Sequence, residues 1–329
     1  MKLATLKTGG RDGSLVVVDQ GLKTAVHVKE IAETLQYALE NWEVCEPALN
    51  DVYSRLNAGG VVDAFPFDPA EAHSPLPRSF QWCEASVWIS HLERCRKATN
   101  RELPPGLYQE PGMYQGASDS FVPPGSPMVC SDENWQPDLE AGVCVITSDV
   151  PMGTRSHDAA KYIKLVVLVN DFSLRRLQPD EMAKGLGVLQ CKPANAYSPV
   201  AVTPRALGKY WDGKLLNRRV HVHVRGELLG KPHAGRDALF NFPQLLEHLA
   251  RTRNLEAGTI IGAGTVSNYD MEAGFGCLLE KRAQEIFDNG KAETPFLRYG
   301  DSIRIECFDD DGASIFGAIE QVLASSDEG

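Results

Sequence analysis

Residues 165–178 read LVVLVNDFSLRRLQ, and within this stretch the chain changes from apolar to polar side chains. The run Leu165–Val169 contains only valine and leucine, which favours a buried strand. Asp171 follows where that strand is expected to end. A carboxylate at such a boundary costs desolvation free energy unless a partner neutralises it. The stretch therefore predicts a sheet with a polar site at one end.

Strand-like patterns dominate the chain around this stretch. Ser156 is expected to cap a helix that runs through Lys164 into the strand. Further strands are predicted at Ala141–Ile146, at Val220–Val224 and at Ser302–Phe308, with two short ones within 3–28. Helical patterns cover 28–57, with a second helix from Pro47 to Leu56, and 242–252. Regular strand–helix alternation is missing, so we expect an α+β fold that is mainly β.

Two segments punctuate this organisation. The proline-rich run 65–77, FPFDPAEAHSPLP, is expected to be an extended connector between a small N-terminal domain, 1–75, and a C-terminal domain, 76–329. The second segment, 258–267, reads GTIIGAGTVS and lacks both the GxGxxG spacing and the P-loop ending. Its glycines should instead mark bulges or close backbone approaches in a β-rich core.

Composition narrows the class of protein. The 329 residues are 43% hydrophobic and 23% charged, which is ordinary for a globular protein, and the formal net charge is -11. This negative charge argues against nucleic-acid and anionic-membrane partners. No stretch reaches the ~18 apolar residues of a membrane span, and the N-terminus does not resemble a signal peptide. None of the eight cysteines has CxxC spacing, so reduced thiols and a cytoplasmic location are expected.

Three acidic residues lie at the ends of apolar segments: Glu84 in CEASVW, Glu140 in DLEAGVCV and Asp171 in LVLVND. Each one alone is best explained as a strand-end residue or a helix cap. If the three converge, a hard cation such as Mg²⁺ or Ca²⁺ bound by all of them would neutralise their charge. Spacing alone leaves open whether they converge.

Histidines offer a candidate general base. His91 follows Glu84 in EASVWISH, and the unperturbed pKa of histidine, about 6.5, suits proton transfer near neutral pH. His221 and His223 would share one face of a strand and could bind a metal. No third ligand lies nearby in sequence, so strand alternation explains this pair better.

Basic and amide side chains follow the central strand. If a helical turn comes after Asp171, then Arg175 and Gln178 share its face. The guanidinium of Arg175, the side-chain amide of Gln178 and the ammonium of Lys192 can all donate hydrogen bonds. They would suit substrate oxygens that gain negative charge in a transition state. For any one of them alone, a solvated surface position is the simpler explanation.

In combination and in this order, the segments of the chain resemble the fumarylacetoacetate hydrolase family, specifically its bacterial fumarylacetoacetase-like branch. The similar segments are MKLATLK, FPFDPAEAHSPLPRSFQW, MYQGASD, VPMG, LVNDFSLRRLQPDEMAKGLG, CKPANAYSPVAVTP, AGTIIGAGTVSN and GFGCLLE. The resemblance covers most of the chain. It implies a small N-terminal domain, a C-terminal β-sandwich roll and a homodimer.

The resemblance also implies roles for individual residues. Metal ligands fall on Glu84, Glu140 and Asp171, and the catalytic histidine falls on His91, with Glu280 as its acidic partner. The remaining positions surround the substrate: Arg175, Gln178 and Lys192 as catalytic side chains, and Tyr114, Thr265 and Ser86 as binding side chains. The cofactor implied is Mg²⁺ or Ca²⁺, with Mn²⁺ as a further option.

The chain departs from the family pattern at the metal motif. The family has Glu-x-Glu, whereas here Glu140 is followed by Ala141 and Gly142, so one carboxylate is absent and weaker metal binding is expected. Glu84 stands where the family usually has Asp, and Ser86 where some relatives have Tyr.

The expected activity is hydrolysis of a carbon–carbon bond in a 1,3-diketo acid. In the parent reaction fumarylacetoacetate gives fumarate and acetoacetate, a step of tyrosine and phenylalanine catabolism. Alternatives are an acylpyruvate hydrolase, an oxaloacetate decarboxylase, or a metal-deficient, non-catalytic family member because of Gly142.

Overall fold

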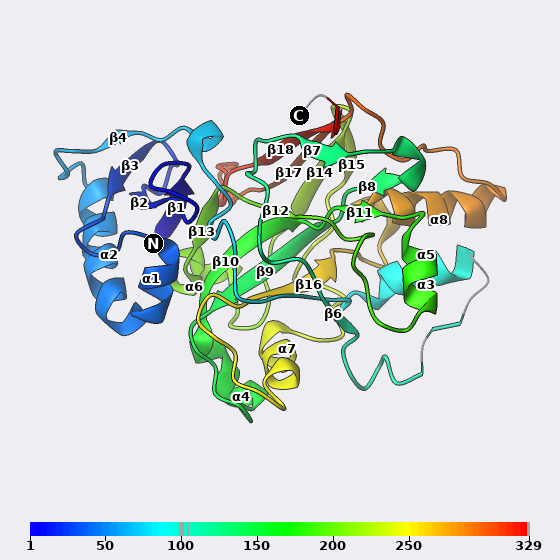
Figure 1. Ribbon diagram of the computed structural model, residues 1–329, viewed down its shortest axis with the longest axis horizontal. Helices are drawn as coiled ribbons and strands as arrows, with labels where there is room; N and C mark the ends of the chain where they lie inside the picture. The colour runs from blue at the N-terminus through cyan, green and yellow to red at the C-terminus, as the bar shows by residue number, and fades with distance from the viewer. Residues whose placement is uncertain (99–101, 104, 328–329) are drawn as a thin grey trace.

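The computed structural model describes residues 1–98, 102–103 and 105–327, and one large sheet runs through most of it (Figure 1). Ten of its strands follow in the spatial order β4 (Phe65–Pro66), β3 (Thr24–His27), β2 (Ser14–Val18), β1 (Lys2–Leu6), β13 (Val200–Val202), β10 (Ile163–Asn170), β9 (Ala141–Thr147), β16 (Ile260–Thr265), β5 (Trp82–Ala85) and β6 (Met113–Gln115). The eleventh, β12 (Ala196–Tyr197), pairs with β10.

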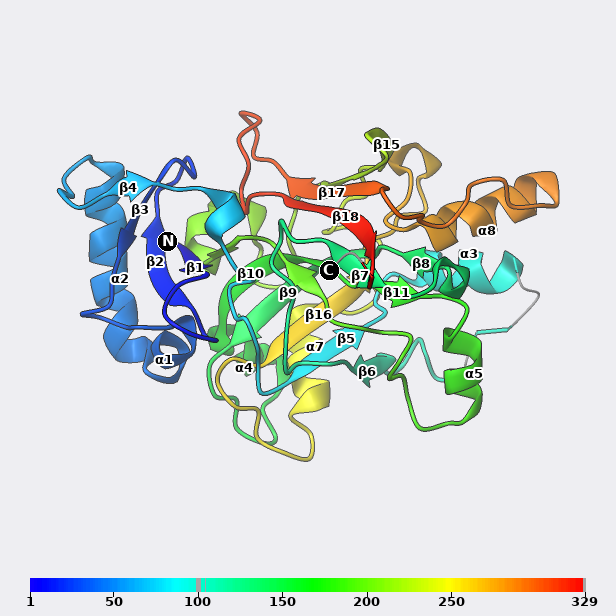
Figure 2. The same cartoon turned by 45° about the horizontal axis from the view of Figure 1, so that its top comes forward.

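A second sheet lies over the central strands of the first, as Figure 2 shows. It contains β15 (Glu227–Gly230), β14 (Val220–Val224), β17 (Ser302–Cys307), β18 (Ile319–Ser325) and β7 (Met128–Cys130). A short pair joins β8 (Pro137–Asp138) to β11 (Ser173–Leu174). Apolar side chains from both sheets form one core, which includes Val143 and Leu168 of the large sheet and Val222 and Ile305 of the small one. The α+β, mainly β fold expected from the sequence is confirmed.

Helices lie mainly at the two ends of the large sheet. The helices α1 (Leu35–Glu40) and α2 (Trp42–Asn57) cover the N-terminal strands, whereas α3 (Ile89–Ala98) and α8 (Leu278–Asn289) pack together at the opposite end (Figure 1). The others are α4 (Ser156–Ala159), α5 (Gln178–Ala183), α6 (Pro204–Leu207) and α7 (Phe242–Leu249). None of the helices in the described part of the chain is long and apolar enough to cross a membrane.

The N-terminal region differs in detail from the sequence expectation. It has three strands within 2–27 rather than two. The helical pattern begins only at Leu35, because the side chain of Thr34 caps that helix by accepting the N–H of Tyr37. The second helix begins at Trp42, five residues before Pro47. Strand β1 pairs with β13, so the large sheet continues across the predicted domain boundary, which stays a prediction.

In the C-terminal region most predicted elements are present. Strand β14 matches the prediction, and β9 and β17 each differ from theirs by one residue. The helix after Ser156 is shorter than predicted: α4 ends at Ala159 and β10 already begins at Ile163. Helix α7 ends at Leu249, and Asn241 and Gln244 form a capping box at its start.

The glycines of the segment 258–267 behave as predicted. Strand β16 has a register shift against β9 between Gly262 and Thr265, and Gly264 has φ +100°. A Cβ on Gly262 would lie 2.3 Å from a carboxylate oxygen of Glu84. The strand therefore needs glycine where the neighbouring side chain crosses its backbone.

Candidate active site

The pairing of the strands gathers the three predicted acids at one end of the sheet. Strands β9 and β10 are antiparallel, with Asn170 opposite Ala141, so Glu140 before β9 and Asp171 after β10 become neighbours. Their backbones are also linked, since Asp171 donates its N–H to the carbonyl of Glu140 at 2.9 Å. Glu84 joins them because β5 runs parallel to β16, with Glu84 opposite Gly262.

Lys192 sits between two of these acids. Its Nζ lies 3.1 Å from Glu140 Oε2 and 2.6 Å from Asp171 Oδ2, and it donates to Ser173 Oγ at 2.7 Å. The lysine is 5% exposed. Two anions and a hydroxyl thus surround a buried ammonium group, and their charge raises its pKa although burial opposes this.

Arg175 also neutralises Glu140, at the carboxylate oxygen that Lys192 does not contact. Its Nη1 lies 2.5 Å from Glu140 Oε1, and its Nε donates to Asp138 Oδ2 at 2.9 Å. All three side chains are buried. The guanidinium is therefore shared by two carboxylates, a geometry for which its planar fork is suited.

The acids differ in how well they are compensated. Burial alone would raise the pKa of Glu140, but Arg175 and Lys192 hold it well below its ordinary value. Burial and the neighbouring Glu140 raise the pKa of Asp171, even though Lys192 opposes this. Burial and Asp171 raise the pKa of Glu84 well above its ordinary range. If all three acids were ionised, the cluster would hold more negative charge than Lys192 and Arg175 neutralise, so that a proton or a cation is favoured at Glu84.

Glu84 carries this imbalance most clearly. Both of its carboxylate oxygens are buried without a hydrogen bond of good geometry from the described residues, although the backbone N–H of Gly264 lies near enough to lower its pKa. An unpartnered buried carboxylate is costly, and a hard divalent cation is the group that removes such a cost. Glu84, Glu140 and Asp171 offer the all-oxygen donor set that Mg²⁺, Ca²⁺ or Mn²⁺ prefers. Among the described residues, however, only His91, Cys277 and Glu280 place their ligand atoms within 4.8 Å of one another, so the role of the three acids as metal ligands stays a prediction.

Gly142, where the family motif has its second glutamate, lies in a closely packed place. A Cβ there would lie 2.8 Å from Val169 Cγ1 and 3.0 Å from the carbonyl oxygen of Gly264. The bulge of β16 brings that carbonyl toward β9. A glutamate at 142 would require the strands to move, which explains why this chain has glycine there.

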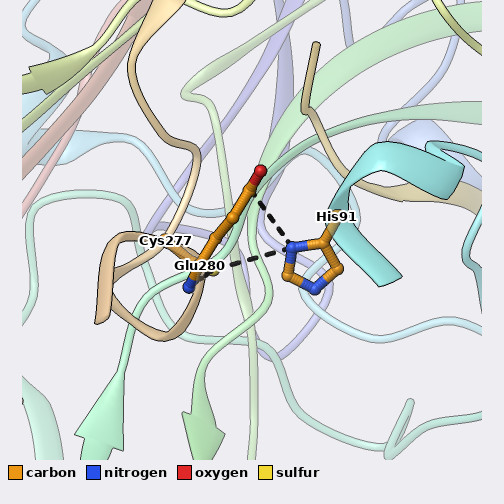
Figure 3. A group of neighbouring side chains, drawn as sticks. All are labelled: His91, Cys277 and Glu280. Carbon is orange, nitrogen blue, oxygen red and sulfur yellow. Dashed lines mark hydrogen bonds and ion pairs between the residues drawn. The ribbon is translucent and has the colours of Figure 1, made fainter. Parts of the chain in front are cut away.

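A second cluster is built around His91 on α3 (Figure 3). Its Nδ1 lies 3.2 Å from Glu280 Oε2. The other oxygen of that carboxylate accepts hydrogen bonds from Arg94 Nη1 at 2.5 Å and from Ser267 Oγ at 2.6 Å. Glu280 is buried, and burial would raise its pKa, but His91, Ser267 and Arg94 lower it. The predicted pair of His91 and Glu280 is therefore in hydrogen-bond contact.

Two cysteines flank the imidazole ring. Cys277 Sγ lies 4.0 Å from Nδ1, and Cys95 Sγ lies 4.0 Å from Nε2. Burial disfavours protonation of His91, yet its pKa is raised well above the ordinary value because both sulfurs stabilise the protonated ring. The neutral, basic form of His91 is therefore favoured only at higher pH.

The start of α8 connects the two clusters. Cys277 caps this helix by accepting the N–H of Glu280 at 3.4 Å, which places Glu280 in the first turn. Asp138, the partner of Arg175, accepts the N–H groups of Leu278 and Leu279 at 2.9 and 3.0 Å. A carboxylate is stabilised at such a helix N-terminus. One helix end thus positions both the acid beside His91 and the acid beside Arg175.

The other predicted residues lie at different distances from the acids. The hydroxyl of Tyr114 donates to Asp171 Oδ2 at 2.5 Å. Thr265 is buried opposite Gly142, and Ser86 is half-buried just after β5. Gln178 is half-buried at the start of α5, and within the described ranges no hydrogen bond joins its side chain to the acids.

Several residues of the site were not identified from the sequence. Asn195 donates to Asp171 Oδ1 at 3.0 Å, and Asp138, Ser173, Ser267 and Arg94 make the contacts described above. Two of them carry a signal that could have been used. Arg94 follows His91 by three residues, which places both on one face of a helix. Asp138 precedes Glu140 by two residues, the spacing that puts two side chains on one face of a strand.

Comparison with known proteins agrees with this architecture. Residues 1–78 match the family profile described as fumarylacetoacetase N-terminal domain 2, and residues 82–324 match that of the fumarylacetoacetate hydrolase C-terminal domain. In solved structures, the fold is similar to that of maleylpyruvate hydrolase from Sphingobium sp. SYK-6, which was determined in complex with manganese(II) and pyruvate. That similarity has a TM-score of 0.65 at 14% identity and covers 99% of each chain.

Two curated relatives are each 27% identical to this chain over part of its length. The mitochondrial oxaloacetate tautomerase FAHD1 of Pongo abelii is 27% identical over 231 residues, which are 64% of this chain and 96% of the relative. The oxaloacetate tautomerase YisK of Bacillus subtilis is 27% identical over 240 residues, which are 71% of this chain and 68% of the relative. Since the C-terminal profile alone spans most of the chain, the protein belongs to the fumarylacetoacetate hydrolase family.

Proposed function

We propose that this protein is a divalent-metal-dependent hydrolase that cleaves a carbon–carbon bond in a 1,3-diketo acid of the fumarylacetoacetate type. The observation that carries the proposal is the adjacency of the two clusters. The start of α8 links them, because Asp138, the partner of Arg175, accepts the N–H groups of Leu278 and Leu279, and Cys277 accepts the N–H of Glu280. A base paired with an acid beside converging carboxylates is the arrangement that metal-assisted hydrolysis requires.

The proposed base acts on water. His91 takes a proton from a water molecule whose oxygen adds to the substrate carbonyl carbon. The bond to the neighbouring carbon then breaks, its electron pair leaves on that carbon, and the proton held by His91 returns there. Glu280 stays anionic because its pKa is lowered, so it orients the ring and stabilises the imidazolium formed in the first step.

The cation that the three acids would hold supplies a Lewis acid for the carbonyl and enol oxygens of the substrate. Around it, Lys192 and Arg175 provide fixed positive charge for oxygens that become anionic. The hydroxyl of Tyr114 and the side chains of Thr265, Ser86 and Gln178 are the proposed contacts to the carboxylate and carbonyl groups. Mg²⁺, Ca²⁺ and Mn²⁺ all suit an oxygen-only donor set.

A second candidate function is keto–enol tautomerisation of a 2-keto diacid. It is favoured by the curated relatives, since both of those described above bear the name oxaloacetate tautomerase. Tautomerisation moves a proton between one carbon and the carbonyl oxygen and needs no added water, so His91 could take the proton from the carbon and return it to the enolate oxygen. Acylpyruvate hydrolysis and oxaloacetate decarboxylation would use the same residues on other substrates.

A substrate panel separates these reactions. The purified protein with Mg²⁺ or Mn²⁺ would be incubated with fumarylacetoacetate, an acylpyruvate and oxaloacetate, and products followed by NMR. The proposal expects two carboxylic acid products from a diketo acid, with loss of activity on chelation. Interconversion of enol and keto oxaloacetate without cleavage would contradict the hydrolase proposal and would support the tautomerase function instead. Absence of any turnover, together with absence of Mg²⁺, Ca²⁺ and Mn²⁺ binding at millimolar concentration, would indicate a non-catalytic family member.

A further inference from the structure

His91, Cys277 and Glu280 form a compact group of a kind different from the three acids. One ligand atom from each residue lies within 4.8 Å of the others, and all three residues are buried. In Figure 3 the sulfur and the carboxylate both approach the same ring nitrogen, Nδ1. The combination of imidazole, thiol and carboxylate suits a cation softer than magnesium.

The separations are close to those that zinc imposes. Bond lengths of about 2.0–2.1 Å to nitrogen and oxygen and about 2.3 Å to sulfur put tetrahedral ligands roughly 3.4 Å (N···O) and roughly 3.6 Å (N···S) apart. The structure has 3.2 Å between Nδ1 and Glu280 Oε2, and 4.0 Å between Nδ1 and Cys277 Sγ. These two separations thus differ from the zinc values by a few tenths of an ångström, and the third, between a Glu280 carboxylate oxygen and Cys277 Sγ, is within 4.8 Å.

The surroundings hold these ligands in place. Arg94 and Ser267 both bind Glu280 Oε1, which leaves Oε2 directed at the histidine. Cys277 is held by its position as the cap of α8. Carboxylate ligands that are oriented in this way by outer hydrogen bonds are typical of metal sites. Cys95 lies at the opposite nitrogen, Nε2, and so belongs to the other side of the ring.

We propose that His91, Cys277 and Glu280 bind a thiophilic divalent cation of the zinc class, at a site separate from the hard-cation site of Glu84, Glu140 and Asp171. On binding, the S–H bond of Cys277 and the N–H bond at His91 Nδ1 break, both protons leave to solvent, and a sulfur–metal bond and a nitrogen–metal bond form. The thiolate and Glu280 together balance the charge of the ion, and water fills the fourth position.

A cation bound at this site should inhibit turnover, and this expectation rests on the proposed function. A cation on Nδ1 uses the lone pair of His91 on that side and removes Glu280 as its partner. The base then loses the group that orients it. Zinc at a concentration that fills the site should therefore inhibit an enzyme already saturated with Mg²⁺.

The binding itself is tested on the full chain with Cd²⁺, which gives an ultraviolet absorption when it binds a thiolate. The unmodified protein should show this band with one equivalent of cation. Cys277→Ser keeps a helix-capping oxygen but removes the thiolate, so the band should be lost and the Cd²⁺ affinity should fall by at least ~10-fold. Cys45→Ser, in the distant helix α2, is the matched control and should keep the band, as should Glu84→Met.

X-ray absorption of the zinc-loaded unmodified protein gives a second measurement that needs no variant. One sulfur ligand with nitrogen and oxygen neighbours supports the site. An all-oxygen shell, or a cadmium band that persists in Cys277→Ser, overturns it. A Cys277-dependent band in a protein without diketo-acid turnover leaves the site standing and removes only the proposed function. Normal diketo-acid turnover without any cadmium band would leave the proposed function standing and would remove the cation site.

Discussion

The two polar clusters at the end of the large sheet differ in whether their buried carboxylates have hydrogen-bond or ion-pair partners. Around His91, both oxygens of Glu280 have partners: one binds Arg94 and Ser267, and the other faces the imidazole. Around Lys192, Glu140 and Asp171 are paired, but both oxygens of Glu84 are buried without a hydrogen bond of good geometry in the described part of the chain. One cluster is complete by itself, whereas the other needs an additional positive charge.

The difference separates two uses of a buried carboxylate. A fully partnered acid keeps a low pKa and a fixed geometry, as is required of a group that orients a base. An acid with a raised pKa and no partner stores unfavourable free energy that a bound cation can release. The following experiments would break or sharpen this contrast.

The largest effect is expected for Lys192→Met. The substitution leaves Asp171 and Glu140 without their shared ammonium group, and loss of one partner of a buried pair costs about 3–5 kcal/mol. Urea unfolding without divalent cations should show this loss, and Mn²⁺ should recover part of it. Lys209→Met, which breaks an exposed pair with Asp310, is the control and should leave the stability nearly unchanged. Equal losses in both variants would contradict the contrast.

Removing the base comes next. His91→Ala should lower kcat by at least ~10²-fold, about 2.7 kcal/mol in the barrier, without weakening Mn²⁺ binding. Steady-state kinetics on the substrate identified from the panel would measure the rate, and calorimetry the metal. His221→Ala, on the half-exposed face of β14, should retain nearly normal turnover. Near-normal turnover of the His91 variant would remove its proposed role.

Glu84→Met should change stability in the opposite direction to Lys192→Met. Replacing an unpartnered buried carboxylate by an apolar side chain of similar length should stabilise the cation-free protein by about 1–3 kcal/mol. It should also abolish the increase in Tm on adding Mn²⁺. Glu181→Met is the matched control, because Glu181 accepts the N–H groups of Leu189, Gln190 and Cys191. That variant should be destabilised, and stabilisation of both would argue against the explanation.

The smallest effect is a shift in pH dependence. The raised pKa of His91 means that its basic form, and hence kcat/KM, should increase as pH rises through that pKa. Arg94→Met removes a cation from Glu280, which then favours the imidazolium more strongly. The rising limb should therefore move to higher pH, by on the order of one unit, and Arg94→Lys should restore it. A uniform loss of activity at every pH would indicate that Arg94 has only a structural role.

The sequence predicted the β-rich fold because apolar alternation, as in Val220–Val224, directly reflects burial on one face of a sheet. It misplaced the end of α4 and the start of β10, because the helix stops at Ala159 and a short 3-10 turn, Ala160–Tyr162, stands where the helix was expected to continue to Lys164. Such boundaries depend on tertiary partners. The backbone N–H of Ser156, for instance, is bound by Glu247 from a distant helix.

Glu84 and Asp171 could be identified because a polar side chain interrupts an apolar segment there, whereas Glu280, Tyr114 and Thr265 came only from the family resemblance. Convergence could not be predicted, since it depends on β9 pairing with β10 and on β5 pairing with β16. The lack of partners at Glu84 is likewise a property of packing. Residues such as Asn195 and Ser267 lie in loops without a periodic pattern, so nothing in the local sequence distinguishes them from ordinary polar residues.

The continuity of the large sheet has a consequence for anyone who divides this chain. Strand β1 covers the edge of β13, with Lys2 to Ala4 paired to Val200 to Val202. A fragment that lacks the first segment would leave the backbone of β13 open to other chains, and an open edge of buried valines invites aggregation. The N-terminal strands thus cover this edge, and the piece with the proposed catalytic residues should need them to remain in solution.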